Sequence, residues 1–141
     1  MNIRDVMTSN PRTVSPEDSI QNAARIMRDE DTGVVPVVEN GRAVGIVTDR
    51  DIVVRAVADG QLDRPVRDIV SGDVITARPD MSTKEAAQLM SDHQVRRLPV
   101  VENERLVGIV SIGDLAVKEG SDKRVGDALQ DISQGVKERE R

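Results

Sequence analysis

Apolar positions along the chain change their spacing in the same order twice. In each half, a stretch with the three- and four-residue spacing of one helix face precedes two runs rich in β-branched residues, which predict strands. The helical stretches carry their stripe at Ile20, Ala23, Ala24 and Met27, and again at Thr83, Ala86, Ala87 and Met90. The first pair of strand runs is 34–38 and 43–48. A short helix is expected to begin near Asp49 or Gly113, and a short strand around 12–14 or 75–77.

The two halves are copies of one unit. The stretch 3–57 aligns with 66–120 without a gap, and 21 of the 55 aligned pairs are identical. The connector 58–65 contains the Gly and Pro that are typical of a linker. We therefore expect a mixed α+β fold with one unit at residues 1–60, a second at 61–120, and a helical tail at 121–141.

Local signals refine the expected elements. Asn40-Gly41 predicts a tight hairpin turn, whereas Asn103-Glu104 lacks the glycine, so the second turn is expected to be of another type. The stretch 15–18 (SPED) looks like a helix entry, with a capping hydroxyl at Ser15. A unit of this size is marginal alone, so we expect two pseudo-symmetric β-α-β-β-α units, packed through their sheets around a shared core with two equivalent clefts.

Composition narrows the possible partners. The formal net charge is −5 with acids and bases interspersed, which argues against nucleic acid. No apolar run approaches a membrane span, and the amino terminus has no apolar signal region, so a cytoplasmic protein is expected. There is no Cys, which excludes thiolate chemistry, and there is no Phe, Tyr or Trp. Any bound base must therefore be held by aliphatic side chains and backbone.

One seven-residue pattern occurs in both copies. The stretches 45–51 (GIVTDRD) and 108–114 (GIVSIGD) share a Gly, a hydroxyl three residues later and an Asp three beyond that. A hydroxyl and an acid at a strand end before a helix are commonly caps. Alternatively, a Gly that permits close approach, a free helix start, a hydroxyl and an Asp that accepts ribose hydroxyls describe a nucleoside phosphate pocket. The residues alone leave both interpretations open. Asp49 aligns with Ile112 and is expected to be only a cap.

These residues resemble the signature of CBS domains, the small regulatory units named after cystathionine β-synthase. The resemblance covers about residues 1–120 and implies a tandem pair that binds an adenosine-type ligand such as AMP, ADP, ATP or S-adenosylmethionine. It implies that Asp51 and Asp114 bind ribose hydroxyls, with Thr48 and Ser111 near the ribose and phosphate. It further implies that the base is read near Val14, Val35, Ala77 and Leu98.

The copies differ just before the second strand pair, where Arg96-Arg97 replace Gly33-Val34. A solvated edge is one interpretation of the two arginines; the resemblance favours contact with a ligand phosphate. His93 has no partner His or Cys in the sequence, so a metal or catalytic role is not expected. The tail carries an apolar stripe for packing on the module or for a dimer contact.

The sequence therefore predicts a non-enzymatic sensor that requires no cofactor. An adenine nucleotide is its expected regulatory ligand, and a homodimer and an unidentified effector protein are its expected partners. Neither nucleic acid nor a membrane is expected as a partner. The alternative is a ligand-free interaction or assembly module, since a fold does not guarantee ligand binding.

Overall fold

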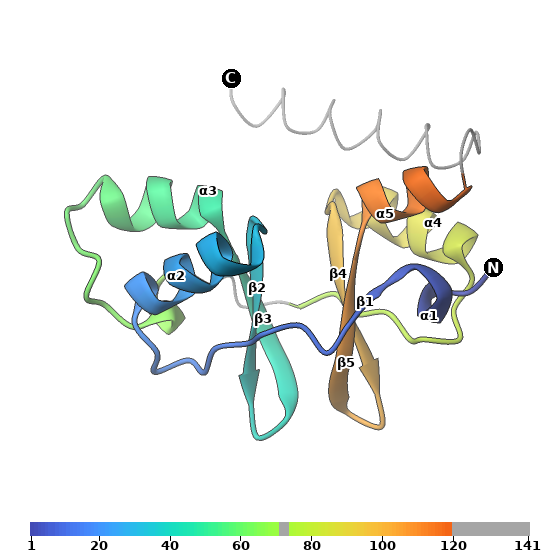
Figure 1. Ribbon diagram of the computed structural model, residues 1–141, viewed down its shortest axis with the longest axis horizontal. Helices are drawn as coiled ribbons and strands as arrows, with labels where there is room; N and C mark the ends of the chain where they lie inside the picture. The colour runs from blue at the N-terminus through green and yellow to red at the C-terminus, as the bar shows by residue number, and fades with distance from the viewer. Residues whose placement is uncertain (71–73, 120–141) are drawn as a thin grey trace. The chain divides into compact units, whose positions relative to one another are not determined.

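The structure is a computed structural model that describes residues 1–70 and 74–119, and the chain forms two compact units (Figure 1). The first-repeat unit consists of Asn10–Val74 together with Asn103–Leu106. The second-repeat unit consists of Met1–Ser9, Ile75–Glu102 and, as far as the described residues reach, 107–119. The mixed α+β class with two related units is confirmed. No helix in the described part of the chain is both long and apolar enough to span a membrane.

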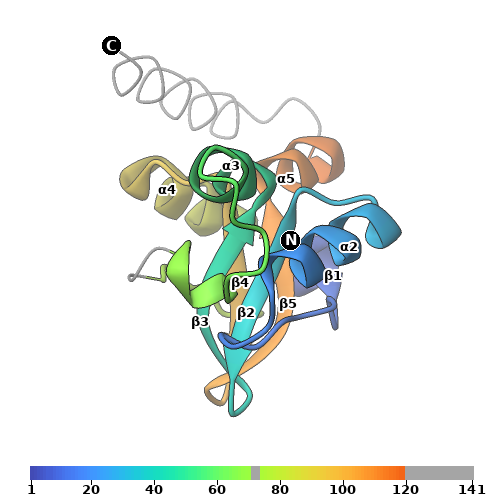
Figure 2. The ribbon, with the colours of Figure 1, turned by 90° about the vertical axis from the view of Figure 1, so that its left-hand side faces the viewer.

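The first-repeat unit is built on an antiparallel hairpin. Its elements are α2 (Ile20–Glu30), β2 (Val34–Glu39), β3 (Arg42–Thr48), α3 (Asp49–Ile52), the π-helical turn η1 (Val53–Val57) and the short 3-10 helix η2 (Val66–Asp68). Figure 2 shows α3 continuing from the end of β3. The register of β2 and β3 shifts between Val37 and Val38. The strand expected at 12–14 is reduced to one parallel bridge from Val14 to Val37.

The second-repeat unit adds a strand from the amino terminus. Its elements are α1 (Ile3–Val6), β1 (Thr8–Ser9), α4 (Thr83–His93), β4 (Arg97–Glu102), β5 (Arg105–Ser111) and α5 (Ile112–Glu119). The strands lie in the order β1-β5-β4, and β1 runs antiparallel to β5 (Figure 1). The strand expected at 75–77 is again one parallel bridge, from Ala77 to Val100. Both helices with apolar stripes and both predicted hairpins are confirmed.

Each unit takes its entry segment from the other repeat. The Ile3 N–H donates to the Met81 carbonyl at 2.9 Å, although the two residues belong to different repeats. The Val66 N–H donates to the Asp18 carbonyl at 2.8 Å. These two bonds join equivalent positions, because Ile3 aligns with Val66 and Asp18 aligns with Met81. The segments that open the two repeats are therefore exchanged.

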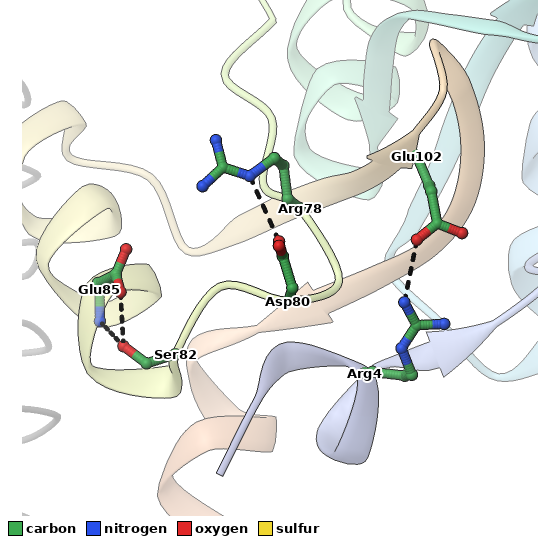
Figure 3. A network of polar contacts seen from close by, with 6 residues as sticks. All are labelled: Arg4, Arg78, Asp80, Ser82, Glu85 and Glu102. Carbon is green, nitrogen blue, oxygen red and sulfur yellow. Dashed lines mark hydrogen bonds and ion pairs between the residues drawn. The ribbon is translucent and has the colours of Figure 1, made fainter.

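Further contacts hold the exchanged segments. The Thr83 N–H donates to the Met1 carbonyl at 3.1 Å, and the equivalent Ile20 N–H donates to the Arg64 carbonyl at 2.9 Å. In the second-repeat unit, Arg4 of α1 also pairs with Glu102 of β4 at 3.0 Å (Figure 3). Both side chains of this pair are about half exposed, so the pair contributes little stability. Burial of the segments' apolar side chains contributes more.

Among the described residues, the buried apolar side chains form two clusters, one in each unit. Ile3 and Val66 are fully buried, and each lies in the cluster of the unit that it joins by exchange. The small size of a repeat predicts that both repeats share one core. In the structure, a segment of the other repeat completes the small core of each unit.

Serine hydroxyls cap the two long helices. Ser19 accepts from the Asn22 N–H at 3.0 Å, and Ser82 accepts from the Glu85 N–H at 3.0 Å (Figure 3). The expected cap at Ser15 is wrong, because α2 begins later. Residue 15 instead opens a turn in which its N–H donates to Asp18 at 2.8 Å.

The two hairpin turns have the same backbone conformation. Asn40 and Gly41 have φ angles of 54° and 81°, and Asn103 and Glu104 have 54° and 67°. The expectation of a different second turn is therefore wrong. Glu104 adopts the left-handed conformation that favours glycine, and its carboxylate pairs with Arg42 at 2.6 Å. This pair lies within the first-repeat unit.

Candidate ligand site

The signature of the first repeat folds into a reciprocal cap at the start of α3. The Thr48 Oγ1 accepts from the Asp51 N–H at 3.1 Å, and the Asp51 Oδ2 accepts from the Thr48 N–H at 3.0 Å. Both residues are partly buried. A hydroxyl and an acid three residues apart close such a box because each side chain reaches the other's backbone N–H.

The second repeat builds the same box at the start of α5. The Ser111 N–H donates to the Asp114 Oδ2 at 2.9 Å, and the Asp114 N–H donates to the Ser111 Oγ at 3.0 Å. The capping interpretation of the signature is thus confirmed in both copies. It also explains the spacing of three between hydroxyl and acid.

The caps leave one acceptor and one donor unused in each signature. Only Oδ2 of Asp51 and of Asp114 takes part in the box, and Oδ1 has no hydrogen-bond partner among the described residues. Thr48 and Ser111 accept a bond in the box, and within the described chain their hydroxyl protons have no acceptor. A carboxylate oxygen and a hydroxyl proton are suited to a ribose diol and to an anionic oxygen, respectively. The capping boxes therefore do not use this oxygen and this proton.

The signature glycine of the second repeat makes room for the chain itself. A Cβ atom at Gly108 would lie 2.6 Å from the Met7 Sδ and 2.8 Å from the Thr8 carbonyl oxygen. The pocket interpretation of the signature assigns this space to a ligand. At Gly108 the close approach is instead by the exchanged β1 segment.

The residue that precedes each strand pair lies next to the helix start. The Ile112 N–H donates to the Arg96 carbonyl at 2.8 Å, and the equivalent Asp49 N–H donates to the Gly33 carbonyl at 2.9 Å. Arg96 is exposed and Arg97 is half-buried, and neither forms an ion pair with a described residue. The structure thus brings the backbone at Arg96 to the signature of its own unit.

The residues expected to contact the base belong to the two apolar cores. Val14, Val35, Ala77 and Leu98 are at most 2% exposed. The N–H and C=O groups of Val14 and of Ala77 bond to β2 and β4, at 2.8 to 3.1 Å. The contacts of these positions with a base stay a prediction.

Asp49 lies beside the signature box, next to Gly33. The sequence predicts that it is only a cap, but Thr48 is the cap of α3. The Asp49 carboxylate lies over Gly33, since a Cβ atom there would be 3.0 Å from its Oδ2. The sequence offered one signal for this contact. Both positions change between the repeats, since Arg96 replaces Gly33 and Ile112 replaces Asp49.

Metal chemistry has no support in the described residues. Within 1–70 and 74–119, no three His, Asp or Glu side chains form a group that could hold a metal ion. His93 is exposed at the end of α4. The tail expected to form a helix at 121–141 lies outside the described residues.

Comparison with known proteins defines the class. The CBS domain model matches residues 3–57 and 66–118, so the chain belongs to the CBS domain family. A relative of similar length is the CBS domain-containing protein YhcV of Bacillus subtilis. It is 46% identical over 132 residues, which are 93% of this chain and 94% of YhcV.

Two other relatives bear on function. The CBS domain pair of protein MJ0100, solved in complex with 5′-methylthioadenosine and S-adenosyl-L-methionine, is 31% identical with a TM-score of 0.77. The match covers 85% of this chain and 100% of that structure. Inosine-5′-monophosphate dehydrogenase of Korarchaeum cryptofilum is 39% identical over 118 residues, or 83% of this chain but only 23% of the enzyme. The chain therefore resembles one part of that enzyme rather than the whole.

Proposed function

We propose that this chain is a non-catalytic sensor that binds an adenine nucleotide or another adenosyl ligand through its two signatures. The single observation that carries the proposal is the geometry of the two capping boxes. Each box fixes an Asp carboxylate with one oxygen bonded and leaves the other, with a neighbouring hydroxyl proton, open to a ligand. In each repeat the unused oxygen accepts a ribose hydroxyl, and the Thr48 or Ser111 hydroxyl donates to the 5′ side of the ligand.

The comparisons support the ligand class. The MJ0100 pair binds two adenosyl compounds, and this chain covers that entire structure. AMP, ADP and ATP belong to the same class, since each carries the two ribose hydroxyls that can donate hydrogen bonds to the Asp carboxylates. The match to inosine-5′-monophosphate dehydrogenase covers 23% of the enzyme, which favours a regulatory rather than a catalytic role.

The sensor acts in the cytoplasm as a homodimer that changes its contacts with an effector protein when ligand binds. The described surface includes an apolar face that supports such contacts. Val53, Val54 and Val57 of η1 are 59%, 55% and 51% exposed, although buried sites are usual for valine. Sedimentation at several protein concentrations, with and without AMP, tests the oligomeric state.

A ligand-free assembly module is the second candidate function. The exposed valines favour it, because exposed apolar patches often mark protein contacts. The capping boxes also account for the signature residues without a ligand. The two candidates differ in whether the purified protein carries or binds an adenosyl compound.

Ultraviolet absorbance separates the two candidates. The chain has no Trp, Tyr or Phe, so an adenine absorption band in the purified and nucleic-acid-free protein reports bound ligand directly. We expect the protein to retain AMP or 5′-methylthioadenosine on a desalting column after incubation. The absence of retained or titratable ligand favours the assembly module.

A matched variant controls for the lost cap. Asp51→Ala removes both a cap and the proposed ribose acceptor, whereas Ser19→Ala removes a cap from the same unit away from the signature. We expect Asp51→Ala to reduce binding and Ser19→Ala to leave it nearly unchanged. An equal reduction in the two variants would mean that folding, rather than contact with the ligand, explains the effect.

A further inference from the structure

The two signatures sit in surroundings of opposite charge. In both units a backbone hydrogen bond joins the first residue of the helix to the residue before the strand pair, at 2.9 Å for Asp49 to Gly33 and 2.8 Å for Ile112 to Arg96. The same backbone geometry therefore presents two different pairs of side chains beside the same capping box.

In the first repeat this position is acidic. The Asp49 carboxylate lies over Gly33, where a Cβ atom would come within 3.0 Å of Oδ2 and 3.2 Å of Cγ. Asp49 is exposed, and its Oδ1 accepts only the neighbouring Arg50 N–H at 2.9 Å. It forms no ion pair with a described residue. Glycine at position 33 leaves the carboxylate room to lie this close to the backbone.

In the second repeat the residues beside the capping box are basic instead of acidic. The uncharged Ile112 replaces the aspartate. It is 4% exposed and lies in the core of its unit. Arg96 and Arg97 replace the small apolar pair, and they have no carboxylate partner in the described chain. An arginine guanidinium is well matched to phosphate because its donors form a planar fork.

A charge count shows the size of the difference. Positions 33, 34 and 49–51 carry a formal charge of −1, and the equivalent positions 96, 97 and 112–114 carry +1. A phosphate monoester carries about −1.5 to −2 charges at neutral pH, so it is repelled by the first set and attracted by the second. At exposed positions in physiological salt, the difference amounts to roughly a tenfold change in affinity.

We propose that the two repeats select different members of the adenosyl class. The second-repeat signature takes a phosphorylated adenine nucleotide, with Arg96 and Arg97 facing its phosphate. The first-repeat signature takes an adenosyl compound with a neutral or cationic 5′ substituent, because Asp49 disfavours a phosphate there. This inference rests on the proposed function, and Asp49, Arg96 and Arg97 are its specificity-determining residues.

Calorimetric titration with AMP and with 5′-methylthioadenosine tests the inference. Asp114→Ala leaves the first signature as the working site, and Asp51→Ala leaves the second. We expect the ratio of AMP to 5′-methylthioadenosine affinity to be roughly tenfold higher or more for the second signature than for the first. Equal ratios in the two variants would overturn the inference while leaving the proposed function intact. No binding of either compound to the unmodified protein would instead overturn the proposed function.

A matched test replaces the specificity-determining residues of one repeat with the residues at the equivalent positions of the other. Adding Asp49→Ile to the Asp114→Ala chain should raise the ratio of AMP to 5′-methylthioadenosine affinity, because the repelling carboxylate is gone. Adding Arg96→Gly and Arg97→Val to the Asp51→Ala chain should lower it. Asp49 and Arg96 are exposed and Arg97 is half-buried, and circular dichroism melting checks that the fold tolerates the three changes. A ratio that neither exchange moves would contradict the assignment.

Discussion

Replacing Ile3 with alanine should weaken the unit formed by the second repeat, which is distant in the sequence, rather than the repeat in which Ile3 lies. Ile3 is fully buried in the cluster that contains Ala86, Met90 and Leu98. The change removes three carbon atoms from that cluster. A buried Ile→Ala change costs about 2–5 kcal/mol, since the lost transfer free energy adds to the cost of the cavity.

Amide hydrogen exchange locates the effect. Ile3→Ala should accelerate exchange in α4 more than in α2, and the equivalent change Val66→Ala should do the reverse. Circular dichroism in urea gives the total loss of stability, because the chain has no Trp for fluorescence. Arg4→Ala is the control; its ion pair with Glu102 is about half exposed and contributes about 1 kcal/mol or less. A larger effect of Ile3→Ala on α2 would refute the exchange of segments.

Three further changes test the local structure. Gly108→Ala should destabilise the protein by about 1–3 kcal/mol in urea unfolding, because its Cβ would overlap the β1 segment, whereas Gly113→Ala, with 3.6 Å to the nearest atom, should not. Equal stabilities would show that β1 is not packed there. Glu104→Gly should be about 1 kcal/mol more stable than Glu104→Ala. Both variants lose the ion pair with Arg42, but only alanine is strained by the positive φ angle at position 104. A more stable alanine variant would contradict the turn conformation. Ser19→Ala should cost about 1 kcal/mol in thermal melts, and Ser15→Ala only a few tenths, because only the former caps α2; the opposite order would place the cap at residue 15.

Local patterns in the sequence predicted most of the secondary structure. The apolar stripes predicted α2 and α4, because one face of each helix is buried in its own unit. The β-branched runs predicted both hairpins, and the signature predicted both helix starts. In these cases the residues that determine the structure are close together in the sequence.

The exchange of entry segments could not be predicted in the same way. Residues 3–6 and 66–69 are so similar that either segment fits either repeat on pattern alone. Their placement depends on long-range contacts such as Ile3 with Met81, which no local period reports. The left-handed Glu104 was missed for a related reason, since its turn follows the geometry of the flanking strands rather than its own preference.

The candidate site was predicted in part. The hydroxyl and acid of each signature lie together as expected, and their role as caps was one of the two interpretations. Whether the second carboxylate oxygen has a partner was not predictable, because that depends on which donors the fold brings near it. The place of Asp49 over Gly33 was not predictable, because the whole β2–β3 hairpin separates the two positions in the sequence.

Calorimetric titration of the unmodified chain and of the double variant Asp51→Ala/Asp114→Ala, each with AMP and with 5′-methylthioadenosine, tests the central claim most directly. The ligand-binding account predicts saturable heat with at least one compound for the unmodified chain and none for the folded double variant. Heat that persists in the double variant, or its absence from the unmodified chain with both compounds, would contradict the claim that the two signatures bind an adenosyl ligand.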